Sequence, residues 1–278
     1  MSSSVSVTEP SASQRLAADV SEMLREQHDY RELLYQMTRR DLLLRYKQTV
    51  MGFGWAVFMP VINTILFSVV FMRVAPINVG VPYPLFAYTG LLAWNFFASS
   101  LRFSVSSLTA NINLVAKVYF PREIFPFSQV IVSAVDFAVG AVLLVAMMVF
   151  YRVVPTSAIL FLPVVILVQI MLTSAVALLL AMANLFYRDV KYLFEVVITV
   201  WMFATSVLYP VDKVTGWAGT VLRLNPMTPI IDAYRAVLLR GELPALLPMS
   251  LTAGLSIVLL ASVWLIFHRS EFQFAEYI

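Results

Sequence analysis

Six long apolar stretches constrain the fold of this 278-residue chain more than any other feature. A helix of about 20 apolar residues is long enough to cross the hydrocarbon core of a bilayer, about 30 Å thick. The mean hydropathy is +0.84 and only 13% of the residues are charged, which excludes a water-soluble globular protein. The sequence therefore predicts an all-α integral membrane protein with six transmembrane helices per protomer. They lie near 54–72, 84–101, 126–150, 158–183, 192–210 and 250–268.

The distribution of lysine and arginine predicts how these spans are oriented. Of the 19 Lys and Arg residues, 13 lie before the first span, in the loops 102–125 and 184–191, or after the last span. Cytoplasmic connections carry the excess of these residues in membrane proteins. Both termini are therefore expected in the cytoplasm, with the membrane crossed several times.

The segment before the first span is expected to have two parts. Residues 1–29 are Ser-rich and mixed in charge, and are expected to form a disordered cytoplasmic tail. Residues 30–48 predict an amphipathic interfacial helix with Arg39 opposite its apolar arc and with Asp41 and Gln48 as exceptions. The apolar arc consists of Tyr30, Leu33, Leu34, Met37 and Leu44. The alternative is a solvated helix that leads into the first span.

Residues 49–278 are expected to form the six-span transmembrane domain, in which 211–249 does not fit a plain bundle. This segment is moderately apolar but contains charges and four prolines. Irregular backbone at membrane depth is tolerated only where protein or a water-filled cavity covers it. We therefore expect two short re-entrant helices on the external side, near 215–224 and 229–239. The alternative is an ordinary external loop folded over the bundle.

Several classes of chemistry are excluded or not expected. The chain has no cysteine, and its two histidines, His28 and His268, lie near opposite ends, so no metal site is expected. None of the nine glycines precedes a lysine, so the chain has no P-loop of its own. We therefore expect no catalytic residue and no bound cofactor. The net charge of +3 is too small and too dispersed to suggest nucleic-acid binding.

Two acidic residues, Asp136 and Glu195, fall inside predicted spans. A carboxylate within a membrane is costly and usually faces the bundle interior or a wet cavity. One interpretation is a proton relay for ion-coupled secondary transport. The other is a helix–helix hydrogen bond near the end of a span.

Aromatic residues make up 13% of the chain, and several fall within the spans rather than at their ends. Aromatic rings pack well against the C–H-rich faces of sugars, so these residues are candidates for the lining of a glycan path. The alternative is packing between helices or contact with lipid. The candidates are Trp55, Phe58, Phe96, Phe97, Trp201 and Phe203.

Four sequence blocks in register resemble one family, the permease subunits of ABC exporters for polysaccharide, O-antigen and teichoic-acid-type polymers. RYKQTVMGFGWAVFMP at 45–60 resembles the start of the family's first span. NINLVAKVYFPREIFP at 111–126 resembles its cytoplasmic loop after span two, and NLFYRDV at 184–190 its loop after span four. NPMTPIIDAYR at 225–235 resembles its external segment before the last span.

The resemblance implies a half-transporter. Two copies would form a homodimer and pair with two separate P-loop ATPase subunits, which would bind ATP and Mg²⁺. The cargo would be a glycan on undecaprenyl diphosphate, carried from the membrane's inner leaflet through a channel between the protomers. A related ABC exporter for a drug or small lipid and the ion-coupled transporter remain as alternatives, whereas a membrane enzyme lacks a candidate catalytic cluster.

The resemblance also suggests roles for three groups of residues. The short loop with two prolines is suited to ATPase coupling through Lys117, Tyr119, Phe120, Pro121, Arg122 and Glu123. Arg122 and Glu123 would pair with the ATPase or with each other. Arg39, Arg40, Arg45 and Lys47 would hold the lipid diphosphate at the cytoplasmic gate, although positive-inside anchoring explains the same charges. The third group belongs to the external re-entrant segment and consists of Asn225, Pro226, Pro229, Asp232 and Arg235. Gly52 and Gly54 would permit a sharp passage into the first span.

Overall fold

The fold is entirely helical over the residues that the structure describes. The computed structural model describes residues 12–47, 49–74, 76–117 and 120–274, and no strand occurs in these ranges. The α-helices are α1 (Ala12–Asp29), α2 (Arg31–Tyr46), α3 (Gly54–Val69), α4 (Tyr83–Val105), α5 (Ser107–Ala110), α6 (Ile112–Lys117), α7 (Ile124–Phe150), α8 (Leu162–Phe186), α9 (Val190–Phe203), α10 (Gly216–Leu224), α11 (Met227–Arg235) and α12 (Leu246–Phe274). Short π and 3-10 segments are η1 (Val70–Val74), η2 (Ser157–Phe161), η3 (Val211–Lys213) and η4 (Ala236–Arg240).

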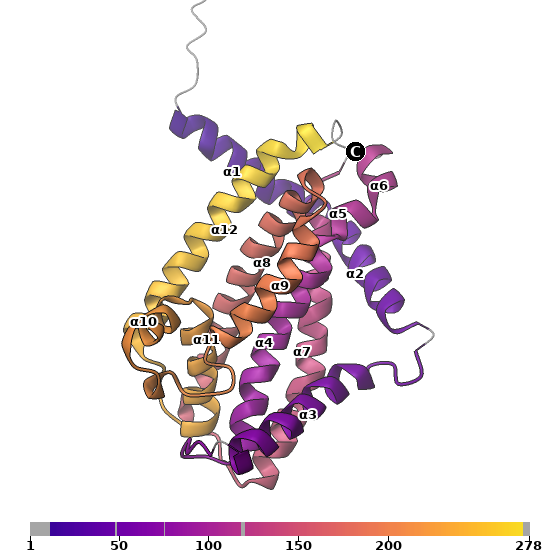
Figure 1. Cartoon of the computed structure of the whole chain (residues 1–278). Coiled ribbons are helices and arrows are strands. Elements are labelled where there is room, and N and C mark those ends of the chain that lie inside the picture. Colours follow the sequence, from indigo (N-terminus) through magenta and orange to yellow (C-terminus); the bar gives the residue numbers. More distant parts are fainter. Residues whose placement is uncertain (1–11, 48, 75, 118–119, 275–278) are drawn as a thin grey trace, which may run out of the picture.

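Helix α4 is the centre of the bundle. It packs against α3, α7, α8, α9 and α11, and α8 in turn packs against α12 (Figure 1). Most side chains of α4 are buried, including Tyr88, Trp94 and Phe97. A helix with protein on nearly every side needs no apolar face for lipid, which explains why α4 tolerates Asn95 and several serines.

Four helical segments are long and apolar enough to cross a membrane: Gly54–Val74, Ile124–Phe150, Ser157–Phe186 and Leu246–Glu271. They coincide with the first, third, fourth and sixth predicted spans. The second coincides with the buried helix α4. The fifth, predicted over 192–210, overlaps α9, whose 14 residues extend only about 21 Å.

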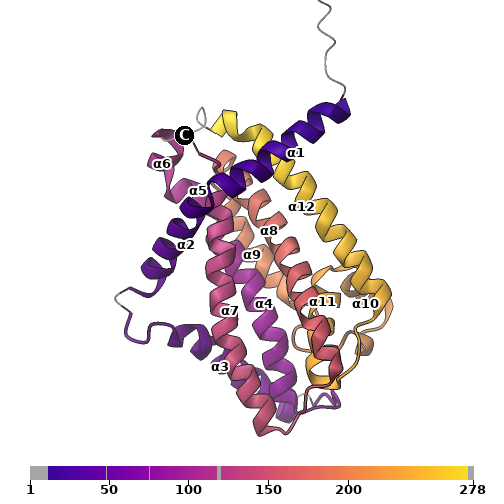
Figure 2. The ribbon, with the colours of Figure 1, turned by 180° about the vertical axis from the view of Figure 1, so that it is seen from behind.

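The two described ends of the chain lie at the same end of the bundle. Helix α1 crosses that end, where α5, α6 and the last turns of α12 also gather (Figures 1 and 2). The connections between α3 and α4 and between α7 and α8 lie at the opposite end. An even number of chain passages is consistent with this arrangement.

The prediction of a disordered tail over 1–29 is wrong for residues 12–29, which form α1, while residues 1–11 lie outside the described residues. The helix is held by side-chain contacts with α12. Met23 is only 4% exposed, and Arg269 of α12 donates hydrogen bonds of 2.9 and 2.6 Å to Asp19. Composition indicated disorder because these tertiary partners lie about 250 residues away in the sequence.

Helix α2 corresponds to the helix predicted over 30–48 and has nearly the same bounds. Tyr30, Leu33, Leu34 and Met37 pack against the bundle, whereas Leu44 is 63% exposed. The helix then turns into α3 through Gly52, whose φ of +51° lies in the left-handed region that glycine adopts without strain. The position of α2 at a membrane interface remains a prediction.

The segment 211–249 contains α10, α11 and η4, close to the predicted helices over 215–224 and 229–239. Helix α11 packs against α4, α8 and α12, and seven of its nine residues are buried. Helix α10 is more exposed, with Trp217 83% exposed. The helices therefore exist, while their depth in a membrane remains a prediction.

Candidate transport site

A cleft of about 300 Å³ opens between α3, α4 and α7. Part of its lining is apolar or aromatic, including Trp55, Met59 and Phe96, and the rest is polar. The polar groups are Asn63, Asn95, Ser99, Arg102, Ser133 and Asp136. A mixed lining of rings and hydrogen-bonding groups is suited to a carbohydrate-like or other amphiphilic ligand, because it offers both apolar contact and hydrogen bonds.

The end of α2 makes a charged contact with α7 beside this cleft. Arg45 Nη1 lies 2.5 Å from Asp136 Oδ2, and the Arg45 guanidinium stacks 3.8 Å from the centre of the Phe103 ring. Tyr46 donates a hydrogen bond to the other Asp136 oxygen. Burial, together with this hydrogen bond, holds the pKa of Tyr46 above its usual value, so the phenol keeps its proton and acts as the donor.

A second contact between α2 and α7 involves Asp41, one turn earlier. Its Oδ2 accepts hydrogen bonds from Ser128 at 2.9 Å and from Gln129 at 2.6 Å, while Oδ1 pairs with Arg40 at 2.8 Å. Asp41 was an exception to the apolar arc of this helix. The structure explains it, because the residue faces a polar patch on α7 rather than lipid.

The four predicted phosphate-binding cations thus differ in their surroundings. Arg40 and Arg45 are paired with Asp41 and Asp136, whereas Arg39 and Lys47 are exposed. They all lie on α2 or directly after it. The structure does not gather all four into one pocket.

Of the six aromatic candidates, Trp55 and Phe96 line the cleft. Phe58 and Phe203 are 41% and 55% exposed on the outside of the bundle. Phe97 is fully buried, and its ring packs edge-on against Trp201 at 5.1 Å between centroids. Phe97 and Trp201 therefore pack between helices in this structure, which agrees with the alternative interpretation for these two residues.

The predicted coupling loop is folded against the end of α12. Phe120 is buried beside Phe125, and Arg122 binds Glu271 through its backbone amide and the Glu271 carbonyl through its guanidinium. Pro121 is also buried. Lys117 ends α6, and Tyr119 lies outside the described residues.

Glu123, at the start of α7, is fully buried although it carries a carboxylate. Its Oε1 accepts hydrogen bonds from Gln27 of α1 at 3.3 Å and from Trp264 of α12 at 3.2 Å. One interpretation of the loop was that Arg122 and Glu123 pair with each other, and in this structure they do not. Instead they connect the loop to the first and last described helices.

In the predicted external segment, Asn225 is a hydrogen-bonding hub between α9 and α11. Its amide nitrogen donates to the Ala204 carbonyl at 2.8 Å and to Thr205 at 2.7 Å. Its amide oxygen accepts from Trp201 and from the backbone of Met227, each at 3.1 Å. Pro226 directly precedes α11, and Pro229 lies in its first turn, where a missing amide costs little.

Arg235 is the most buried charged side chain of that segment, at 1% exposure. It donates to the carbonyls of Ser206 at 2.6 Å and Val207 at 2.5 Å, and its guanidinium lies 3.6 Å from the Phe86 ring centre. Gly90 lets the guanidinium approach, because a Cβ there would lie 2.5 Å from Arg235 Nη2. Asp232 instead faces Arg240, 4.0 Å away.

Sequence reasoning missed the polar partners that come from distant elements. Ser128 and Gln129 on α7 and Gln27 and Trp264 around Glu123 carry no local motif. For Ser128 and Gln129, the available signal was that two polar residues stand side by side in the otherwise apolar first turns of α7.

An all-helical bundle with four candidate spans among the described residues indicates an integral membrane protein. Residues 32–239 match the ABC-2 type transporter family, and the chain belongs to this family. It is thus a membrane subunit for transport and not itself the ATPase.

Curated relatives extend along nearly the whole chain. The O-antigen export system permease protein RfbA of Myxococcus xanthus is 31% identical over 256 residues, which cover 91% of this chain and 98% of that protein. A protein of the same name from Klebsiella pneumoniae is 29% identical over 250 residues, covering 88% and 94% respectively.

Proposed function

We propose that this chain is the permease subunit of an ATP-driven exporter that moves a lipid-linked polysaccharide across the bacterial inner membrane. The similarity to an O-antigen export permease over 98% of that protein's length carries the proposal. Undecaprenyl diphosphate is the proposed lipid carrier. Two ATPase subunits, which belong to other chains, would supply ATP hydrolysis.

The cleft between α3, α4 and α7 is proposed to form part of the glycan path. Its mixed lining of Trp55, Phe96, Asn95 and Arg102 offers ring faces and hydrogen bonds together. Helix α3 beside it keeps a largely exposed apolar surface, with Ile65 54% and Leu66 58% exposed. A second copy of the chain would cover this surface and complete a channel between two protomers in a homodimer.

The coupling loop is the proposed route by which ATPase movement reaches the spans. Because Arg122 is bound to Glu271 and Glu123 to Gln27 and Trp264, a displacement of the loop moves α1, α7 and α12 together. Glu123 acts by holding the loop in this arrangement, since its buried carboxylate does not reach a partner surface.

The ion-coupled alternative is less well supported by the surroundings of its two carboxylates. Asp136 pairs with Arg45 and Glu195 with Arg102 at 2.9 Å, so each carboxylate already has a cationic partner within the chain. Such pairs connect helices, which is the other interpretation of the two residues. The Asp136→Asn, Glu195→Gln double variant should therefore retain export.

Deletion of the gene tests the proposal directly. We expect loss of surface polymer and accumulation of lipid-linked glycan in the inner leaflet, with recovery when the wild-type gene is returned. A co-purified P-loop ATPase provides the matching biochemical result. Normal surface polymer after deletion, together with a chain that purifies without any ATPase, would refute the proposed function.

A further inference from the structure

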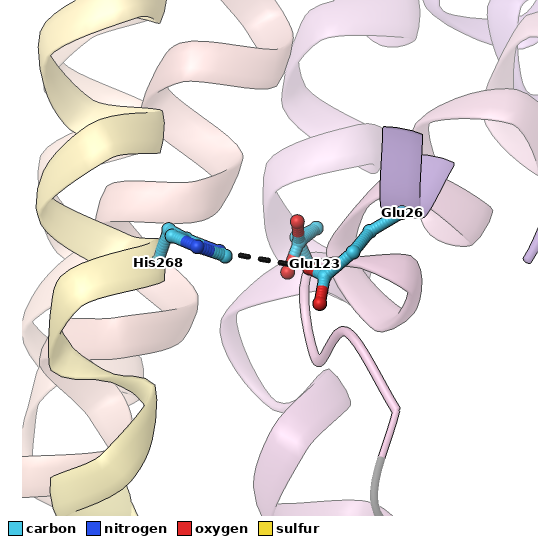
Figure 3. A group of neighbouring side chains, drawn as sticks. All are labelled: Glu26, Glu123 and His268. Carbon is cyan, nitrogen blue, oxygen red and sulfur yellow. Dashed lines mark ion pairs between the residues drawn. The ribbon is translucent and has the colours of Figure 1, made fainter. Parts of the chain in front are cut away.

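Three potential metal ligands meet where α1, the coupling loop and α12 converge. Glu26 comes from α1, Glu123 directly precedes α7, and His268 lies in the last turns of α12 (Figure 3). One donor atom from each residue lies within 4.8 Å of the others. In Figure 3 the imidazole of His268 and the two carboxylates point toward one another.

Each of the three residues has a buried polar atom without a hydrogen-bond partner. These atoms are Glu26 Oε2, Glu123 Oε2 and His268 Nδ1. The contact between His268 Nδ1 and Glu26 Oε2 spans 3.8 Å, which is too long for a hydrogen bond. Buried polar atoms are almost always satisfied in folded proteins. A ligand that binds all three residues would satisfy these atoms.

The local charge indicates that this ligand is positive. Two carboxylates, those of Glu26 and Glu123, face one imidazole. The Arg122 guanidinium nearby is directed instead to the carbonyl oxygens of Glu271 and Val115.

The surrounding hydrogen bonds resemble those that orient metal ligands. Gln27 and Trp264 both donate to Oε1 of Glu123 and not to its Oε2. Carboxylates that bind metals are commonly held in this way by neighbouring donors. The Glu123 side chain is fully buried, so its position is fixed by packing as well.

We propose that Glu26, Glu123 and His268 bind a divalent transition-metal cation of the zinc type. Two carboxylates and one imidazole form a donor set that suits Zn²⁺ and leaves one position for water. A tetrahedral ion at about 2.0–2.2 Å from its ligands brings them to within about 3.3–3.6 Å of one another. The side chains thus need to close by about an ångström.

The bound ion would fasten α1 and α12 to the start of α7. It would add to the existing contacts between these elements, which are the hydrogen bonds of Glu123, the Arg269–Asp19 pair and the 3.8 Å contact between His268 and Glu26. Metal binding would therefore order α1 over the coupling loop. This effect concerns the membrane subunit alone and does not depend on the identity of the exported cargo.

Cobalt binding to the purified full-length chain tests the site. The chain should carry a tag without histidines, be stripped with EDTA and be titrated with Co²⁺, whose visible d–d absorption reports coordination. We expect one ion per chain, displaced by Zn²⁺. His268→Gln should weaken binding by at least about 10- to 100-fold. His28→Gln is the matched control, because His28 is an exposed histidine outside the cluster and its loss should leave binding unchanged.

A second variant and a second measurement make the outcome decisive. If His268→Gln does not elute as a folded chain in size-exclusion chromatography, Glu26→Gln takes its place. Zn²⁺ should slow hydrogen exchange in α1 of the wild-type chain and not in the variant. The proposal is overturned if the wild-type chain binds no ion stoichiometrically, or if the variants bind as tightly as the wild type. Export by a chain that binds no ion would leave the proposed function intact.

Discussion

The two ends of the bundle are held together by different kinds of polar contact. At the end that carries α1 and the coupling loop, charged side chains meet other charged side chains, as in Asp19–Arg269. In the segment that leads from α9 to η4, the buried Arg235 binds the backbone carbonyls of Ser206 and Val207. Contacts between charges change with protons, ions and partners, whereas contacts with carbonyls do not. The first end is suited to regulation and the second to permanent attachment.

The largest loss of stability is expected from replacing Arg235, which binds two backbone carbonyls. Arg235→Met would leave the Ser206 and Val207 carbonyls buried without donors. Hydrogen bonds to charged groups contribute about 1.5–3 kcal/mol each, so we expect a loss of at least about 3 kcal/mol in unfolding free energy. Thermal unfolding followed by fluorescence-detected chromatography measures it. An unchanged melting temperature would show that the attachment in this segment is not Arg235.

The next effect tests the space that Arg235 requires. Gly90→Ala places a Cβ 2.4 Å from the Val207 carbonyl oxygen and 2.5 Å from Arg235 Nη2. Overpacking of this kind costs about 1–3 kcal/mol. Gly254→Ala on α12 is the matched control, because a Cβ there meets nothing within 4 Å. Equal melting temperatures for the two variants would contradict the close approach at Gly90.

A smaller effect is expected at the half-buried ion pair between α2 and α7. Arg45→Gln should lower the unfolding free energy by about 1–2 kcal/mol, because it leaves Asp136 with Tyr46 alone. Arg39→Gln removes the same charge from an exposed position of the same helix and should change stability by less than about 0.5 kcal/mol. In a double-mutant cycle, Asp136→Asn should make the Arg45 change milder. Strict additivity would show that the pair is not coupled.

The smallest effect is expected at Arg102 and Glu195, whose side chains are 47% and 50% exposed. Exposed ion pairs contribute about 0–1 kcal/mol, and salt should remove even this contribution. Arg102→Gln should therefore lower the melting temperature less than Arg45→Gln under the same conditions. A larger decrease would indicate that Arg102 has an additional role within the cleft.

The length of the apolar runs predicted much of the fold, because a helix that crosses lipid requires about 20 consecutive apolar residues. The four apolar spans and the helices α10 and α11 followed from run length and proline position alone. Helix α9 is shorter than predicted, because its apolar run continues into turns around Thr205 and Ser206 that carbonyl-binding side chains stabilise. Run length does not reveal such a change in backbone conformation.

The candidate site was less predictable, because its contacts join residues far apart in the chain. Arg45 was predicted as a cation for the lipid diphosphate, and Asp136 was considered separately as a carboxylate within a span, whereas the structure pairs the two. His268 was set aside because the other histidine is distant, yet its neighbours are the carboxylates of Glu26 and Glu123. Proximity of this kind is a property of packing that residue spacing does not encode.

The burial of Glu123 has a consequence for biosynthesis. Its hydrogen-bond partners are Gln27, which lies 96 residues before it, and Trp264, which lies 141 residues after it. The coupling loop therefore cannot reach this arrangement until the ribosome has synthesised the chain past Trp264. A truncated product would expose a carboxylate and an aromatic surface, both of which cellular proteases and chaperones could recognise as a mark of incomplete assembly.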